Sequence, residues 1–98
     1  TAAYGKADWA RVNAETQRVF EGFAKLRADG TAPDSPEARS LVRSWQVVIT
    51  RNFYDCTDEI LLGLAAMYEA DERFQKSIDK AGEGTAAFMA AAIRACIR

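Results

Sequence analysis

An uncharged run over residues 60–68 is the feature that most limits how this chain can fold. These nine residues carry no charge, and the hydroxyl of Tyr68 is their only hydrogen-bonding side-chain group. As a helix the run would have no polar face, so we expect it to be enclosed on nearly every side. A strand is disfavoured because the run holds a single β-branched residue and is rich in Leu and Ala. With Thr57 as N-cap and two acids in the first turn, the pattern predicts a central buried helix over residues 58–70.

Two longer helices are predicted before this run. Over residues 6–29 a mostly apolar stripe recurs every three or four positions, and Gly30 ends the helix. The stripe comprises Trp9, Val12, Thr16, Val19, Phe23 and Leu26. The second helix is predicted over residues 36–52, because Ser35 supplies a capping hydroxyl and Pro36 suits the first helical position. Its inner face is expected to hold Leu41, Val42, Trp45, Val48 and Ile49.

Two shorter helices are predicted after the run. Asp71 is a suitable N-cap for a helix that ends near Lys80, with Phe74 and Ile78 turned inward. A glycine-containing hinge leads to an alanine-rich helix over residues 85–97, whose small side chains favour close helix packing. Five helices and no convincing strand define an all-α antiparallel bundle, and 98 residues suit a single domain over residues 1–98.

Charge and hydropathy exclude several classes of partner. The net charge is −1, so there is no basic surplus for direct contact with nucleic acid or an anionic membrane. No apolar run approaches the roughly 18 residues of a membrane span, and no signal peptide is visible. We therefore expect a cytoplasmic protein that does not bind membranes.

The chain contains no histidine, which removes much catalytic and metal chemistry. Serine and cysteine nucleophiles lose their usual base, and zinc and haem lose a common ligand. Cys56 and Cys96 form no CxxC motif, so we expect two free thiols and neither a metal nor a cofactor. Cys56 precedes a predicted helix, a position that would lower its pKa, but it has no imidazole beside it.

Other polar groups have ordinary structural interpretations. The carboxylates at Asp55, Asp58 and Glu59, and at Asp71 and Glu72, stand where helix starts favour negative charge, so capping is favoured over acid–base catalysis. Trp45 is either a core residue or one wall of a pocket. Composition and periodicity by themselves indicate only a small helical domain.

Particular residues nevertheless go further than composition does. They are Asn52-Phe53-Tyr54-Asp55-Cys56, Glu59, Leu64, Met67-Tyr68, Asp71-Glu72-Arg73-Phe74, Ile78-Asp79 and Ala91-Ala92-Ile93. Together these residues resemble a known family, the TipAS antibiotic-recognition domain of TipA-type regulators in the MerR family. The lead-in Thr1-Ala2-Ala3-Tyr4, Lys6 and Asp8-Trp9 and the loop Pro33-Asp34-Ser35 are also similar to the family. The resemblance covers nearly the whole chain, and its most specific part runs from Asn52 to Phe74.

The resemblance implies a globin-like helical domain with a deep cleft that binds thiopeptide antibiotics and other bulky, largely apolar compounds. In full-length members a preceding winged helix-turn-helix binds DNA and a long helix dimerises, whereas shorter members sequester the drug. The implied partner of this chain is a small-molecule antibiotic or drug. DNA contact and dimerisation are expected only through segments outside this chain.

Three positions depart from the founding member of the family. That protein attaches its thiopeptide to a cysteine, and the matching position here is Gly63. Cys56 matches a second family cysteine that is not taken as the attachment site. Without a cysteine at position 63, the resemblance implies reversible binding. Trp45 and Phe53 stand in place of histidines, which implies a more apolar pocket. Gly63 either leaves room for a bulky ligand or allows close helix packing.

Our leading hypothesis is a non-catalytic drug-binding domain. The expected cleft residues are Trp9, Trp45, Phe53, Tyr54, Ile60, Gly63, Leu64, Met67 and Tyr68. Tyr54 and Tyr68 combine an aromatic ring with a hydroxyl that can orient a ligand. The second hypothesis is an interaction module whose groove binds a partner helix. The third, and least favoured without histidine, is a small enzyme that uses Cys56 or a carboxylate.

Overall fold

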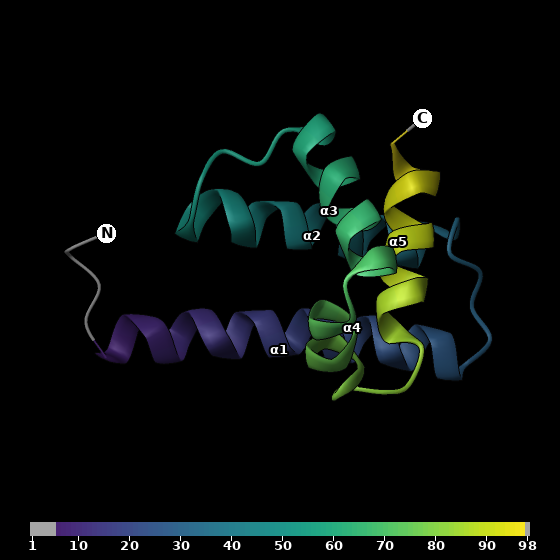
Figure 1. Ribbon diagram of the computed structural model, residues 1–98, viewed down its shortest axis with the longest axis horizontal. Coiled ribbons are helices and arrows are strands. Elements are labelled where there is room, and N and C mark those ends of the chain that lie inside the picture. Colours follow the sequence, from purple (N-terminus) through teal and green to yellow (C-terminus); the bar gives the residue numbers. More distant parts are fainter. Residues whose placement is uncertain (1–5, 98) are drawn as a thin grey trace.

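Five α-helices make up the part of the chain that the computed structural model describes, residues 6–97, with side chains from residue 9 onward (Figure 1). They are α1 (Lys6–Ala28), α2 (Pro36–Asn52), α3 (Asp58–Ala70), α4 (Glu72–Asp79) and α5 (Thr85–Cys96). No strand occurs within residues 6–97, and each boundary lies within one residue of its predicted position. The lead-in residues 1–5 and the side chains of Lys6 and Asp8, which contribute to the family resemblance, lie outside the described residues.

Local capping explains why the helices begin and end where they do. The hydroxyl of Ser35 accepts from the Ala38 amide at 3.1 Å, and that of Thr57 accepts from the Ile60 amide at 3.2 Å. Gly30 follows the end of α1, and its φ of 77° suits the left-handed residue that closes a helix. The capping predictions at Ser35, Thr57 and Gly30 are thus confirmed.

The helices form two antiparallel pairs that cross each other. α1 and α2 run side by side in opposite directions, and α3 and α5 form a second pair across them (Figure 1). α4 is a short helix against α3 and α5. α5 packs against all four other helices, most extensively against α3. In the described part of the chain, no helix is long and apolar enough to cross a membrane.

A buried central helix is present, but it is α5 and not the predicted stretch over residues 58–70. Seven of its residues are buried: Thr85, Ala86, Phe88, Met89, Ala90, Ala92 and Ile93. In α3 only Leu61, Ala65 and Tyr68 are buried, whereas Ile60 and Met67 are 40% and 42% exposed. The alanines of α5 let neighbouring backbones come close on several sides, and the bulkier α3 then covers one of those sides.

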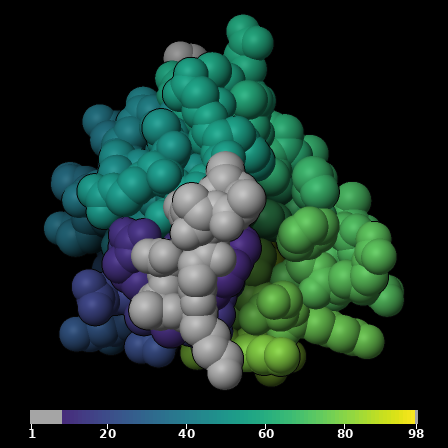
Figure 2. Space-filling model, turned by 90° about the vertical axis from the view of Figure 1, so that its left-hand side faces the viewer, coloured from purple at the N-terminus to yellow at the C-terminus, as the bar shows by residue number. Residues whose placement is uncertain are grey.

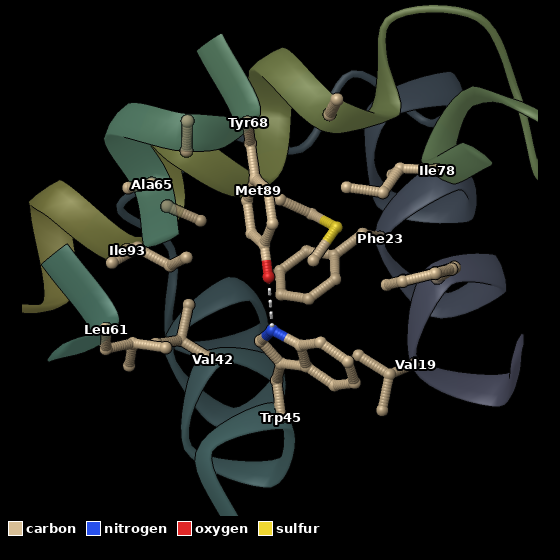
Figure 3. Close-up of a cluster of buried hydrophobic side chains, with 14 of the residues drawn as sticks. Val19, Phe23, Val42, Trp45, Leu61, Ala65, Tyr68, Ile78, Met89 and Ile93 are labelled. Carbon is tan, nitrogen blue, oxygen red and sulfur yellow. Dashed lines mark hydrogen bonds between the residues drawn. The ribbon is translucent and has the colours of Figure 1, made fainter. Parts of the chain in front are cut away.

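The core gathers side chains from all five helices (Figure 3). Phe23 of α1 meets Phe88 of α5 edge to face, with ring centroids 6.3 Å apart. Ile78 of α4 is 2% exposed, as predicted. The inward prediction for Phe74 is wrong, because its ring packs on the edge of the core against Tyr68, at 6.1 Å, and remains 37% exposed.

The buried start of α5 depends on a glycine and on groups from the preceding turn. Gly84 precedes the helix with a φ of 84°. The Asp79 carboxylate accepts from the Ala86 amide at 2.9 Å, and the Thr85 hydroxyl donates to the Gly82 carbonyl. These contacts satisfy polar groups where water has little access.

We expect Gly84→Ala to lower the free energy of unfolding by about 1–3 kcal/mol, because a side chain there is strained by the positive φ. Its Cβ would also lie 2.5 Å from the Arg27 guanidinium. The matched control is Gly63→Ala, because a Cβ at Gly63 meets nothing within 4 Å. Inside a helix this change should stabilise by about 0.5–1 kcal/mol. Urea unfolding followed by circular dichroism measures the free energy of unfolding of both variants. Equal changes in Gly84→Ala and Gly63→Ala would contradict this account of how α5 begins.

Candidate functional site

A cavity of about 400 Å³ lies between α1, α2, α3 and the segment that joins α2 to α3. It is lined by Trp9, Trp45, Ile49, Asn52, Phe53, Tyr54, Leu64 and Tyr68. Five of these eight residues are aromatic and none is charged. The part of α1 drawn in purple, the α2–α3 segment in teal and the α4 region in green all reach the molecular face in Figure 2.

The cavity exists because α1 and α3 do not pack together along their length. In the described residues α1 packs on α2 and α5, whereas α1 and α3 make little direct contact. Trp9 of α1 instead approaches Phe53 beyond the end of α2, with ring centroids 6.5 Å apart. Phe20 of α1 supports the Trp45 ring from behind, at 5.3 Å. Aromatic rings from α1, α2, the α2–α3 segment and α3 therefore surround the cavity.

The structure brings together six of the nine predicted site residues. Trp9, Trp45, Phe53, Tyr54, Leu64 and Tyr68 line the cavity. Trp45 is both a core residue and part of the cavity wall, the two roles that the sequence left open. It is 7% exposed, and it lines the cavity. Sequence reasoning missed Ile49 and Asn52 as lining residues. The available signal was helical spacing, because Trp45, Ile49 and Asn52 recur on one face of α2.

The other three predicted residues, Ile60, Gly63 and Met67, lie outside the cavity lining. They share one face of α3, and all three are exposed. The close-packing interpretation of Gly63 is wrong, because open space surrounds the position of a Cβ there. These residues form an exposed, mostly apolar stripe, which we name the α3 stripe.

A buried hydrogen bond joins α2 to α3 at the cavity wall. The Trp45 indole Nε1–H donates to the Tyr68 hydroxyl oxygen at 3.2 Å (Figure 3). Burial raises the pKa of Tyr68 to about 12, and the hydrogen bond from Trp45 opposes this shift only in part. The phenol therefore stays neutral over the physiological pH range.

Asn52 ties α2 to α1 beside the cavity. Its amide nitrogen donates to the Glu15 carboxylate at 3.2 Å and to the Val48 carbonyl at 2.9 Å. Glu15 also lies 3.6 Å from Arg11 and 4.0 Å from Arg51. This polar group closes one edge of an otherwise aromatic site and holds the middle of α1 against the end of α2.

The segment that carries Phe53 and Tyr54 is fastened to α2 by a polar clamp. Gln46 donates to the Cys56 carbonyl and to the Asp58 carboxylate, both at 2.9 Å. Arg43 donates to the same carboxylate at 2.8 Å. Hydrogen bonds from Gln46 and then Arg43 hold the pKa of Asp58 below its ordinary value. The clamp lets two half-exposed aromatic residues keep a defined place at the cavity.

Cys56 does not have the character of an activated nucleophile. Burial first, and then the nearby charges of Asp55 and Asp58, raise the pKa of its thiol above the ordinary value. The sequence-based expectation of a lowered pKa is therefore wrong, because burial and two carboxylates outweigh the start of the helix. Cys56 and Cys96 are both free thiols, as predicted. Within the described residues no cluster of acidic and cysteine side chains could hold a metal ion.

A larger depression, of about 670 Å³, lies on the outer face of α2 but is a weaker candidate. It is more open than the cavity and is lined by Pro36, Arg39, Ser40, Arg43, Ser44 and Val47. It has no aromatic wall and it presents two guanidinium groups to solvent. Ligand sites are typically concave, mostly apolar and furnished with a few placed polar groups, which describes the cavity between α1, α2 and α3.

Fold and cavity together define a class of small all-helical domains that enclose an uncharged, mostly aromatic cavity. The chain belongs to the TipAS antibiotic-recognition domain family, whose sequence profile it matches over residues 1–96. It is 40% identical over 95 residues to the HTH-type transcriptional activator TipA of Streptomyces coelicolor, covering 97% of this chain and 38% of that protein. It is 39% identical over 93 residues to the HTH-type transcriptional activator mta of Bacillus subtilis, covering 95% of this chain and 35% of mta.

The fold also matches a solved structure, that of TipAS in complex with nosiheptide from a thiopeptide antibiotic multidrug resistance system of Streptomyces lividans. The TM-score is 0.92 and the identity 39%, over 99% of this chain and 68% of that one. This match confirms the globin-like helical architecture. The chain spans little more than a third of the length of the two transcriptional activators.

We expect Gln46→Ala to loosen the segment over residues 53–57, because it removes the donors to the Cys56 carbonyl and the Asp58 carboxylate. Amide exchange there should become several-fold faster while exchange in α5 is unchanged. Ser44→Ala, an exposed change on the same helix, is the control. Unaltered exchange in Gln46→Ala would mean that the clamp does not order this segment.

Proposed function

We propose that this chain is a non-catalytic effector domain that binds bulky, largely apolar antibiotics of the thiopeptide kind. The observation that carries the proposal is the aromatic, uncharged cavity in a fold that superposes closely on nosiheptide-bound TipAS. Such a cavity gives binding energy through apolar contact and ring stacking, with few polar groups to fix orientation. Neither an activated thiol nor a metal cluster in the described residues offers an alternative chemistry.

The proposed contact surface has an inner and an outer part. The inner part is the cavity, where Trp9, Phe53 and Tyr54 stand at exposed positions over the buried Trp45 and Tyr68. The outer part is the α3 stripe, which offers Ile60 and Met67 to a ligand too large for the cavity. At Gly63 the surface has no side chain, so a flat group can lie against the helix backbone. All nine residues predicted from the sequence thus keep a place in the proposal.

The relatives suggest how binding is used. TipA and mta are transcriptional activators of the HTH type and are much longer than this chain. We place the chain, as a single domain over residues 1–98, in the cytoplasm as the drug-sensing part of such a regulator or as a stand-alone drug-sequestering protein. DNA contact and dimerisation would belong to other segments of a regulator.

One alternative has a structural observation behind it. The α3 stripe is exposed and apolar, which also suits the docking of a partner helix. The aromatic cavity favours the antibiotic, because a helix would cover the stripe without entering a hollow walled by five rings.

We expect nosiheptide to bind reversibly. Isothermal titration calorimetry should show saturable binding, and mass spectrometry of the denatured complex should show unmodified protein, since Gly63 offers no nucleophile and the pKa of Cys56 is raised. Absence of binding would contradict the proposed function. A covalent adduct on Cys56 would leave the ligand class intact but overturn the reversible mechanism.

We also expect α1 to act as a lid. Because α1 makes little contact with α3, a ligand between them adds apolar contact to both. Without ligand, amides in residues 6–29 should exchange faster than those in residues 58–70, and nosiheptide should protect both. Equally slow exchange of both segments in the free protein would mean that the cavity is rigidly preformed.

The variant Trp9→Ala tests whether α1 acts as a lid through its effect on the affinity for nosiheptide. It should weaken nosiheptide binding about tenfold and lower the stability of residues 36–97 by less, because Trp9 is 45% exposed and packs on Phe53, which is itself 51% exposed. Val47→Ala, an exposed change on the outer face of α2, should leave affinity unchanged.

A further inference from the structure

We infer that the Tyr68 hydroxyl is the specificity-determining hydrogen-bond donor of the cavity, and that it selects ligands that present an acceptor such as an azole nitrogen or an amide carbonyl. The inference rests on the proposed function, since it assigns chemistry to the same site. It follows from the direction of one hydrogen bond and from the surroundings of the two residues that make it.

The direction of the hydrogen bond between Trp45 and Tyr68 is fixed by the chemistry of the indole and the hydroxyl. An indole Nε1–H can only donate, so in the 3.2 Å contact with Trp45 the Tyr68 oxygen must be the acceptor. The hydroxyl proton of Tyr68 is therefore directed elsewhere. Among the residues that the structure describes, the Tyr68 hydroxyl donates no hydrogen bond to a protein acceptor.

Burial makes this proton significant. Tyr68 is 4% exposed and Trp45 is 7% exposed, so water has little access to the pair. Both residues belong to the wall of the cavity, and Figure 3 shows the hydrogen bond that joins them. A ligand acceptor at this wall would satisfy the donor, whereas an alkyl group would bury it unpaired at a cost in affinity.

Neighbouring donors are less suited to the role. Trp45 donates to Tyr68, and the amide nitrogen of Asn52 donates to Glu15 and Val48. Tyr54 also lines the cavity, but it is 49% exposed, so water competes for its hydroxyl. The hydrogen bond from Trp45 also polarises the Tyr68 O–H and makes it a better donor. Because burial raises the pKa of Tyr68 to about 12, the donor keeps its proton across the physiological pH range.

The variant Tyr68→Phe tests the assignment with nosiheptide as probe, because it removes the hydroxyl and leaves the ring. Val47→Ala, an exposed change on the outer face of α2, is the control. Titration calorimetry should show about a tenfold loss of affinity for Tyr68→Phe and an unchanged affinity for Val47→Ala. Urea unfolding of the free variants separates this effect from a change in stability.

A measurement on the unaltered protein keeps the test independent of how Tyr68→Phe folds. In the nosiheptide complex the Tyr68 hydroxyl proton should exchange slowly enough to be seen by NMR. It should give nuclear Overhauser effects to both the Trp45 indole and the ligand, a signal that a merely structural hydroxyl would not produce.

The outcomes distinguish the inference from the proposed function. Failure of the unaltered chain to bind nosiheptide overturns both. Binding by the unaltered chain, with equal affinity in a folded Tyr68→Phe or with no Overhauser effect from the hydroxyl to the ligand, overturns only the assignment of Tyr68.

Discussion

The close approach of four helices to α5 is the constraint on which the rest of this structure depends. Alanines over much of its surface let helix backbones come near from several directions. Larger side chains on α5 would push the neighbouring helices apart and disrupt their packing in the core. Because α5 occupies the centre, α3 can bury only one face, and its remaining apolar residues are left toward solvent. The exposed α3 stripe is therefore a product of the packing.

The cavity follows from the same arrangement. α1 is the longest helix and lies along α2, but its first turns reach beyond the part of the bundle that α5 and α3 fill. Aromatic side chains from the end of α2 and the following segment surround the remaining space. No charged residue lines the cavity, and the pairs of Arg43 with Asp58 and of Glu15 with Arg51 lie beyond its lining. Hydrogen bonds and ion pairs outside the cavity hold its walls in place, and aromatic residues line its interior. The cavity therefore keeps its shape without a charged group inside it.

Much of this fold could be predicted from local signals in the sequence. A helix start depends on a capping side chain and an amide two or three positions away. The three helix starts predicted from such caps, at Ser35, Thr57 and Asp71, are therefore correct. Which helix would be central could not be predicted in this way. The runs in α3 and α5 both lack a polar face, and only the tertiary packing decides that the alanine-rich one is enclosed.

The site shows the same division between local and tertiary information. Six of the cavity-lining residues were predicted from the sequence, because aromatic side chains near a helix end and a family motif point to them. Asn52 was missed because its role depends on Glu15, 37 positions away. The thiol of Cys56 was misjudged because its pKa reflects burial, which the position before a helix does not reveal.

The empty space around Gly63 carries a consequence for how such domains diversify. A side chain placed at this position meets no neighbour, so the fold neither requires glycine nor resists its replacement. Selection can therefore act on the chemistry displayed on α3, whether inert, polar or reactive, without a compensating change in the core. A surface of this kind lets one scaffold move between different modes of ligand capture through a single substitution.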